Sequence, residues 1–222
     1  MDKEHTSDNS PPDAVSNDTG EPSTATAAEA DRYNTMGIAQ ATQNMALQSV
    51  AAFSRAIELD PENPGYYYNR GIVYANDGSL ALALQDFTHA IELRGEDADI
   101  LNNRGNVYAM MGDWESAVTD LSRCIELNPN QPEPYNNRAA VLAQKGDYIA
   151  SMIDFGKAIS IKPQYAEAHF NLARVNAMVG NCDLASSHLK EAIQLQPAYK
   201  QVARAVGDFE HCRENPGFTV PL

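Results

Sequence analysis

The sequence predicts an all-α protein that forms a solenoid, and two observations support that prediction. One pattern of residues recurs every 34 positions, five times, without insertion or deletion between residues 30 and 199. A fixed period of this length is typical of stacked units of two helices, which form an elongated array around a continuous core. Within each unit the apolar residues follow the i, i+3, i+4, i+7 spacing of an amphipathic helix.

The period divides the chain into five repeats and two terminal segments. We expect the acidic segment 1–29 to be disordered, because it has too few large apolar residues to offset the entropy of ordering. We expect residues 200–214 to form a capping helix that covers the last repeat with Val202, Val206 and Phe209. Residues 215–222 would then form a tail. The repeats are 30–63, 64–97, 98–131, 132–165 and 166–199.

The third repeat shows how each unit divides into two helices. Its apolar residues predict one helix at 99–111 and a second at 114–127. Gly112 lies between them, and Pro129 follows the second, where a helix can no longer continue. The position of Gly112 holds glycine in repeats two to five and Asn44 in the first. Glycine and then asparagine best tolerate a left-handed backbone, so we expect that conformation at these turns.

Small residues recur at one position on each helix of every repeat. Small side chains on facing ridges allow two helices to approach to the short end of the ~8–10 Å packing range. We expect larger residues, Phe53 in the first repeat and its equivalents, to fill the space between consecutive repeats. The small residues are Gly37, Gly71, Gly105, Ala139 and Ala173 on the first helices, and Ser49, Ala83, Ala117, Ser151 and Ala185 on the second.

The order of small and large residues in each repeat resembles the tetratricopeptide repeat (TPR). The second repeat departs from that pattern where Gly95 replaces the usual proline. The resemblance extends over residues 30–199 and implies a right-handed solenoid with a concave groove. It also implies a protein that binds other proteins and is not an enzyme. The third repeat shows the pattern through Leu101, Gly105, Tyr108, Ala117, Leu121, Cys124 and Pro129.

Arginine and aspartate occur together in three repeats, sixteen positions apart. The arginine stands where the TPR pattern has leucine, and the first and fifth repeats have neither residue of the pair. This joint occurrence predicts a salt bridge between the two helices of a repeat, with the forked guanidinium facing the carboxylate. Contact of the arginines with a ligand is the alternative. The pairs are Arg70 with Asp86, Arg104 with Asp120, and Arg138 with Asp154.

An asparagine recurs at the same period in repeats two to five. By the resemblance to TPR proteins it lies in the concave groove, where such a ladder holds the backbone of an extended peptide. An amide offers both a donor and an acceptor, which suits a peptide backbone. The alternative is that these asparagines hydrogen-bond the helix of the next repeat. The candidate groove residues are Asn34, Tyr68, Asn69, Asn102, Asn103, Asn106, Asn137, Phe170, Asn171 and Arg174.

The charge distribution narrows the class of partner. The whole net charge of −14 arises in residues 1–131, so the chain repels phosphate backbones and we expect no nucleic-acid partner. A basic protein or peptide is favoured, although the same acidity also serves solubility. Some TPR proteins clamp acidic chaperone tails with basic residues, but Glu167 and Asn171 occupy positions that would have to be basic. The competing hypothesis is a self-associating structural element or assembly factor, formed by end-to-end stacking of repeats.

The remaining residues predict no disulfide, metal, cofactor or catalytic site. Three widely spaced cysteines do not make a disulfide framework, so we expect reduced thiols, with Cys124 as a small core residue. Cys182 and Cys212 lie near three histidines in the sequence, but at a spacing that fits no zinc pattern. No catalytic motif occurs. No apolar run is long enough to span a bilayer and no signal peptide is evident, so we expect a cytoplasmic protein without membrane contact.

Overall fold

The computed structural model describes residues 24–218 and residue 220, and these residues form helices and loops without any strand. Two helices account for each predicted repeat, which confirms the predicted all-α solenoid. The pairs are α1 (Thr24–Thr42) with α2 (Ala46–Leu59), α3 (Pro64–Asn76) with α4 (Leu80–Arg94), α5 (Ala98–Met111) with α6 (Trp114–Leu127), α7 (Pro132–Gln144) with α8 (Tyr148–Ile161), and α9 (Ala166–Met178) with α10 (Cys182–Leu195).

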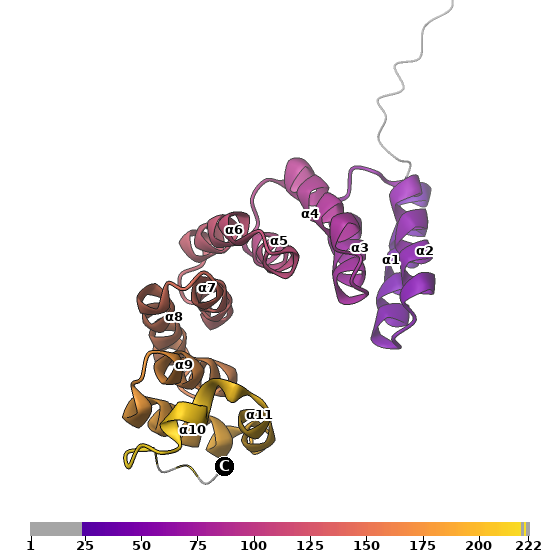
Figure 1. Cartoon of the computed structure of the whole chain (residues 1–222). Coiled ribbons are helices and arrows are strands. Elements are labelled where there is room, and N and C mark those ends of the chain that lie inside the picture. Colours follow the sequence, from indigo (N-terminus) through magenta and orange to yellow (C-terminus); the bar gives the residue numbers. More distant parts are fainter. Residues whose placement is uncertain (1–23, 219, 221–222) are drawn as a thin grey trace, which may run out of the picture.

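The helix pairs follow one another along an arc, with the odd-numbered helices on its inner side (Figure 1). Each odd-numbered helix contacts its own partner and also the next odd-numbered helix. The concave face of the molecule is therefore lined by the first helices of the repeats.

The first helix begins earlier than we expected. α1 starts at Thr24, inside the segment 1–29, so the prediction of disorder is wrong for residues 24–29. Ala30 is fully buried in a cluster with Ala56 and Tyr66, which explains why the helix is already formed at this point. Residues 1–23 lie outside the described part of the chain.

A left-handed residue separates the two helices of each repeat, which confirms that prediction. Asn44 has a φ of 63° and Gly112 a φ of 80°. The equivalent glycines of the other three repeats have φ values between 81° and 84°. In two repeats an aspartate then begins the second helix: Asp113 accepts a hydrogen bond of 3.1 Å from the Ser116 amide, and Asp147 makes the same contact in the fourth repeat. Residues close to the turn in the sequence thus determine both the turn between the two helices and the start of the second helix.

The two helices of a repeat approach each other closely at the predicted small positions. Ser49 Oγ donates a hydrogen bond of 2.8 Å to the carbonyl oxygen of Gly37. A Cβ atom added at Gly37 would lie 2.7 Å from the ring of Phe53. Phe53 therefore packs on the glycine of its own repeat, and not only between consecutive repeats as we expected.

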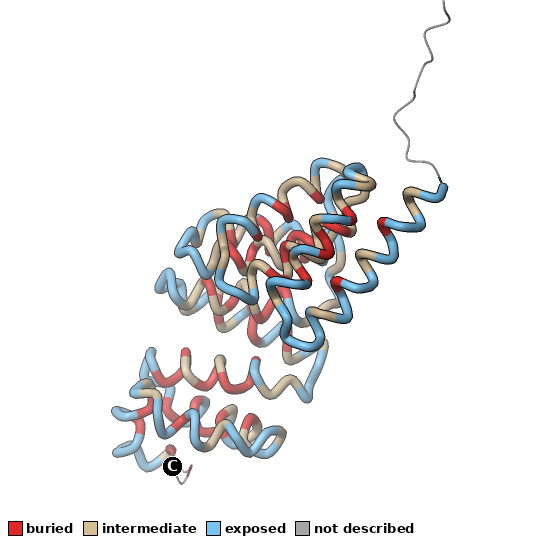
Figure 2. Tube along the Cα trace, turned by 90° about the vertical axis from the view of Figure 1, so that its right-hand side faces the viewer, coloured by how far each residue is buried: buried red, intermediate tan, exposed pale blue. Residues whose placement is uncertain are grey.

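The core is a row of large side chains, one from each repeat. These side chains are almost completely removed from solvent, and buried residues gather where the helices face each other (Figure 2). The row consists of Phe53, Phe87, Leu121, Phe155 and Leu189.

The C-terminal segment closes the last repeat, but it is not the single helix that we expected at 200–214. α11 (Tyr199–Ala205) is followed by Val206, whose extended backbone (φ −88°, ψ 138°) interrupts the helix. A 3₁₀ helix, η1 (Gly207–Cys212), comes next and packs against α9. Glycine at position 207 permits this break, because it has a low helix propensity.

The side chains that form the cap also differ from the expected set. Phe209 is fully buried, but Val202 is 41% exposed. The expected tail belongs to the core, because Phe218 and Val220 are both buried in the same cluster as Phe209. The cap therefore extends at least to residue 220.

Candidate interaction surface

Each of the three arginine–aspartate pairs forms a two-pronged ion pair between the helices of its repeat. Arg104 Nε and Nη2 donate to Asp120 Oδ2 and Oδ1 over 2.7 and 2.9 Å. The pairs of the second and fourth repeats have the same geometry, with distances between 2.7 and 2.9 Å. The aspartate side chains are at most 8% exposed, so the carboxylates are almost removed from water.

A hydroxyl group from the preceding repeat completes each of these sites. Arg104 Nη1 donates to Thr88 Oγ1 over 3.3 Å, and the other two arginines reach Ser54 and Ser122 over 2.9 and 3.0 Å. We did not expect these hydroxyl groups, although they recur at the 34-residue period. Gly156 holds the next equivalent position, and the repeat that follows it has Leu172 where the other three have the paired arginine. Each arginine thus joins its own repeat to the one before.

The ion pairs hold the arginines in structural positions. The hydrogen bond with Asp120 raises the pKa of Arg104, against the opposing effect of burial. The three guanidinium groups also lie 5.7–5.9 Å from the centroids of neighbouring tyrosine rings, which is within the range of cation–π contact. Because all three nitrogens of each guanidinium are already engaged, the geometry favours the structural role over contact with a ligand.

The fifth repeat has a histidine pair in place of the ion pair. His169 Nδ1 and His188 Nδ1 lie 3.2 Å apart, and His169 Nε2 lies 3.0 Å from the carbonyl oxygen of Pro163. The carbonyl requires a proton on His169 Nε2, so His169 Nδ1 accepts and His188 Nδ1 donates. Burial lowers the pKa of His188, and the neighbouring His169 lowers it further.

Two pairs of asparagines connect neighbouring repeats on the concave side. Asn69 Nδ2 donates to Asn34 Oδ1 over 2.9 Å, and Asn137 Nδ2 donates to Asn102 Oδ1 over 3.0 Å. Each pair uses one amide donor group and one acceptor. The Oδ1 atoms of Asn69 and Asn137, and the Nδ2 groups of Asn34 and Asn102, make no hydrogen bond within the described residues. Each pair thus retains one unused amide donor and one unused amide acceptor.

The other asparagines of the ladder have different partners. Asn103 Nδ2 donates to Tyr68 Oη over 3.1 Å, and Asn171 Nδ2 donates to Asn136 Oδ1 over 3.5 Å. Asn106, on the same helix as Asn103, is partly exposed and has no hydrogen-bond partner in the described part of the chain. The ladder asparagines therefore join each repeat to the preceding one, and not to the next one as the alternative had it. Asn69 and Asn137 also keep unused oxygen atoms, which suit a peptide backbone.

Phe170 is not an open groove residue, because the C-terminal segment covers it, whereas the side chain of Arg174 is 39% exposed although it pairs with that segment. Phe170 is 5% exposed, and its ring stacks on that of Tyr199 with centroids 4.6 Å apart. Arg174 Nε donates to Asp208 Oδ2 over 2.5 Å. The 34-residue pattern places both residues on the inner helix, but it does not show that residues 199–212 fold back over this helix.

A pocket of about 220 Å³ opens between α7, α8 and α9. Ala143, Phe155 and Met178 contribute apolar side chains. The polar side chains of the lining are those of Gln144, Asn171 and Arg174. Ala140 also lines it and holds the position in its repeat that Asn106 holds in the third. The pocket therefore continues the line of candidate groove positions.

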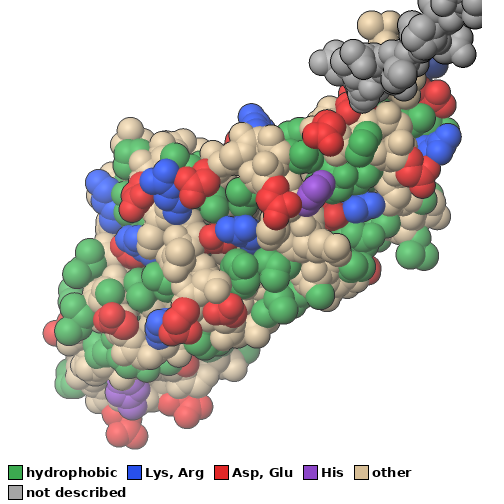
Figure 3. All heavy atoms as spheres, turned by 90° about the horizontal axis from the view of Figure 1, so that it is seen from above, with side chains coloured by type: hydrophobic (Ala, Val, Ile, Leu, Met, Phe, Trp, Pro, Cys, Tyr) green, Lys and Arg blue, Asp and Glu red, His purple; other side chains and the backbone are tan. Residues whose placement is uncertain are grey.

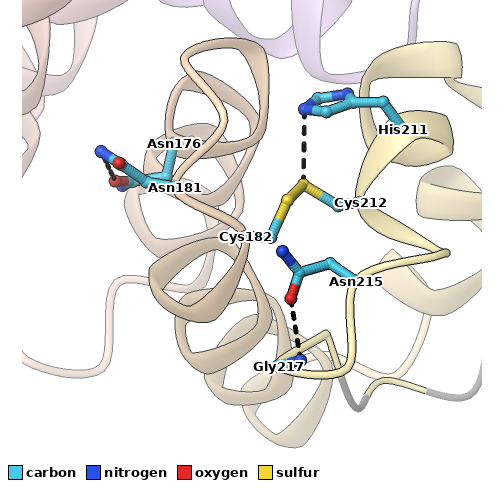
Figure 4. Close-up of a disulfide and its surroundings, with 7 residues drawn as sticks. All are labelled: Asn176, Asn181, Cys182, His211, Cys212, Asn215 and Gly217. Atoms are coloured by element: carbon cyan, nitrogen blue, oxygen red, sulfur yellow. Dashed lines mark hydrogen bonds between the residues drawn. A yellow bond between two sulfur atoms is a disulfide. The ribbon is translucent and has the colours of Figure 1, made fainter.

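Cys182 and Cys212 form a disulfide, so our expectation of reduced thiols is wrong for these two residues (Figure 4). Cys182 is the first residue of α10 and Cys212 the last of η1, and their Cα atoms lie 5.3 Å apart. The pairing depends on the return of the C-terminal segment to α10, which a separation of 30 residues in sequence does not reveal. Cys124 is a free, buried cysteine, as expected, and burial raises the pKa of its thiol to about 11.

Acidic and basic side chains are interspersed with apolar ones on the face of the molecule drawn in Figure 3. Ion pairs also connect neighbouring repeats, such as Arg123 with Glu96 and Lys145 with Glu115, each over 2.7 Å. None of the described helices combines the length and the apolar character that a membrane span requires. The face in Figure 3 therefore offers a mixed surface without a large region of one sign.

Comparison with known families decides the identity of the repeats. Four models described as tetratricopeptide or TPR repeats match residues 48–78, 64–97, 98–131 and 121–152. The chain belongs to the tetratricopeptide-repeat family. No curated protein matches the sequence.

Solved structures of TPR proteins resemble this TPR chain over most of its length. The structure titled "YrrB: a TPR protein with an unusual peptide-binding site" is 25% identical, with a TM-score of 0.63, and covers 78% of this chain and 91% of its own. A crystal structure of MamA protein is 21% identical, with a TM-score of 0.67 and coverage of 78% and 94%. Pseudomonas aeruginosa pilF is 16% identical, with a TM-score of 0.68 and coverage of 87% and 95%. The last two similarities concern the fold alone.

Proposed function

We propose that this TPR protein is a non-catalytic scaffold that binds an extended peptide, or an extended segment of a basic protein, on its concave face. The two asparagine pairs carry this proposal. Each pair leaves one amide oxygen and one amide nitrogen unused, and an extended backbone presents N–H and C=O groups that match them whatever its side chains are. The similarity to YrrB, whose title names a peptide-binding site, supports the same class of ligand.

Two further features would add side-chain preference. The apolar side of the pocket between α7 and α9, formed by Ala143, Phe155 and Met178, would accept one aliphatic side chain of the ligand. The net charge of −14, which arises before residue 132, would favour basic residues in the part of the ligand that lies on the N-terminal repeats. The ligand would thus be a basic segment with an apolar residue toward the C-terminal end of the groove.

The state of the buried charges supports binding rather than catalysis. The arginines and aspartates of repeats two to four are engaged with one another and with hydroxyl groups of the preceding repeat. Such fully partnered groups stabilise the scaffold and are not poised for proton transfer or nucleophilic attack.

End-to-end stacking of repeats, the competing hypothesis, has less support. Stacking requires that the open face of the last repeat meets the first repeat of another chain. Phe209 and Phe218 of the C-terminal segment already fill the last repeat's face. Small-angle scattering over a concentration series tests this, and we expect the radius of gyration to remain constant.

Selection of ligands from a library of displayed peptides tests the proposed function. We expect the wild-type protein to enrich basic sequences that carry an aliphatic residue. Asn102→Asp keeps the oxygen that accepts from Asn137 but removes the unused Nδ2 donor, so it should weaken binding of a selected peptide without lowering stability. Ala143→Arg should also weaken binding by filling the pocket.

A matched control separates charge from hydrogen bonding. Gln85→Glu adds the same charge on the exposed side of α4, and we expect it to leave the dissociation constant unchanged. Equal binding by Asn102→Asp, Ala143→Arg and the wild type would reject the concave face as the binding site.

A further inference from the structure

The fold of the C-terminal segment brings three metal-binding side chains together that lie apart in the sequence. Cys182 starts α10, whereas His211 and Cys212 end η1. The two sulfur atoms and a ring nitrogen of His211 all lie within 4.8 Å of one another. In Figure 4 the imidazole points at the sulfur of Cys212, from the side of the disulfide away from Asn215.

The chemistry of these donors matches zinc. Zn²⁺ prefers cysteine sulfur at about 2.3 Å and histidine nitrogen at about 2.0–2.1 Å in a tetrahedron, which separates a sulfur from a nitrogen ligand by about 3.5 Å. His211 Nε2 lies 3.5 Å from Cys212 Sγ in the structure. This edge of the tetrahedron is therefore already formed.

The second edge becomes available when the disulfide is reduced. Two sulfur ligands of a tetrahedral zinc ion lie about 3.8 Å apart. Once the bond is reduced, the two sulfur atoms separate to their ordinary contact distance, which is close to that edge. A modest separation of the two side chains is thus enough to admit an ion.

We propose that the reduced protein binds one Zn²⁺ ion through the thiolates of Cys182 and Cys212 and the imidazole of His211, with the fourth position open to solvent. A dithiol reductant transfers two electrons and two protons to the disulfide and itself becomes a disulfide. Zinc then displaces the two thiol protons into solvent. Because the bonded sulfurs of the oxidised form cannot ligate the ion in this way, oxidation and zinc binding exclude each other.

The zinc ion would take over the role of the disulfide in a reducing compartment. Disulfides rarely persist in the cytosol, which is the compartment that we propose for this protein. Loss of the link between α10 and η1 would free the segment that contains Phe209, covers Phe170 and pairs with Arg174. Zinc would hold the same segment in place, so the last repeat would remain capped in either redox state.

Zinc titration of the reduced full-length chain tests the site. The protein is reduced with a phosphine, freed of metal, and titrated with Zn²⁺ against a chromophoric chelator. We expect one ion to bind with sub-micromolar affinity, and Co²⁺ in its place to give the intense visible absorption of tetrahedral thiolate coordination. The oxidised protein should bind neither ion at this site.

Three variants make the test specific. Cys182→Ser should abolish binding, and His211→Ala should weaken it by at least about tenfold, since even residues that only orient a ligand contribute that much. Cys124→Ala is the matched control, because four of the five repeats already have alanine at this position, and it should bind zinc as the wild type does.

Folding of the variants is checked independently. His211 is exposed, so His211→Ala should still form the Cys182–Cys212 disulfide under oxidising conditions. The proposal is overturned if the reduced wild type binds no zinc, if His211→Ala binds it equally well, or if Cys124→Ala loses it.

Discussion

Arg104 shows at the scale of single residues how one side chain serves two repeats. Its guanidinium group is fixed by the carboxylate of Asp120 in its own repeat and by the hydroxyl of Thr88 in the preceding one. The joint occurrence of arginine and aspartate could be recognised in the sequence because both residues recur and vanish together. The contact with the hydroxyl group could not be predicted, because serine and threonine are common at exposed helix positions and their presence alone does not indicate a hydrogen bond to arginine.

Removal of either partner of this ion pair should destabilise the protein. Arg104→Ala leaves Asp120 buried without a cation, and such a loss costs about 3–5 kcal/mol of unfolding free energy. We expect Asp120→Ala to have a similar effect. The double variant should be at least as stable as the less stable of the two single variants, because the second substitution removes a side chain that has already lost its partner. Urea denaturation measures all three.

An exposed ion pair provides the control for this experiment. Arg123 pairs with Glu96 and Glu126 at the surface, where solvent screens the charges, so Arg123→Ala should destabilise the protein far less than Arg104→Ala does. Additive losses in the Arg104 and Asp120 cycle would show that the two residues act independently, contrary to the structure.

Titration of His188 should make the fifth repeat sensitive to acid. The pKa of His188 is lowered from 6.5 in the folded protein, so the unfolded chain binds its proton at a higher pH. The resulting contribution to stability is present above pH 6.5 and is lost as the pH falls through the lowered folded pKa. We expect His188→Asn to reduce this pH dependence in urea denaturation, and His89→Gln, at a more exposed histidine, to leave it intact. Identical pH profiles for all three proteins would contradict the role of the histidine pair.

At the scale of helices, the close approach of the two helices in a repeat could be predicted, whereas the shape of the cap could not. The small residues, the left-handed turn residues and the amphipathic spacing are local signals, and each recurs in all five repeats. The break between α11 and η1 has no such repetition, because it occurs once and depends on contacts with α9. The disulfide escaped prediction for the same reason, since a single long-range contact leaves no periodic trace.

Two glycine-to-alanine substitutions should have opposite effects on stability. A Cβ atom at Gly105 would lie 2.9 Å from Leu121 Cγ, so Gly105→Ala should overpack the core and cost about 1–3 kcal/mol. Gly156 lies within α8, and a Cβ atom there would meet nothing within 4 Å. Gly156→Ala should therefore stabilise the protein by about 0.5–1 kcal/mol through its higher helix propensity. Thermal unfolding followed by circular dichroism compares the two, and a stabilising Gly105→Ala would show that the helix pair is looser than described.

At the scale of the whole molecule, the period alone predicts a solenoid with a concave face, but not how much of that face is open. Positions equivalent by 34 residues were all candidates for the groove. The C-terminal segment removes Phe170 from that set and engages Arg174 in an ion pair, while Asn34, Asn102 and Asn106 keep polar atoms without a partner among the described residues. The 34-residue period therefore predicts the course of the backbone well. It does not predict the surface of the terminal repeats, because these repeats have different neighbours from the inner ones.

Side-chain footprinting of the protein with a selected peptide bound tests the central claim, that the concave face is the binding surface. Hydroxyl radicals label exposed side chains, and mass spectrometry compares the labelling with and without ligand. Met178 lines the pocket and is 48% exposed, so we expect its oxidation to fall when the peptide binds, together with that of Tyr68. Leu47 and Ile153, which are 84% and 66% exposed on the second helices of their repeats, should be labelled as in the free protein. Protection of Leu47 and Ile153 with Tyr68 and Met178 unchanged would place the ligand on the outer helices and contradict the account.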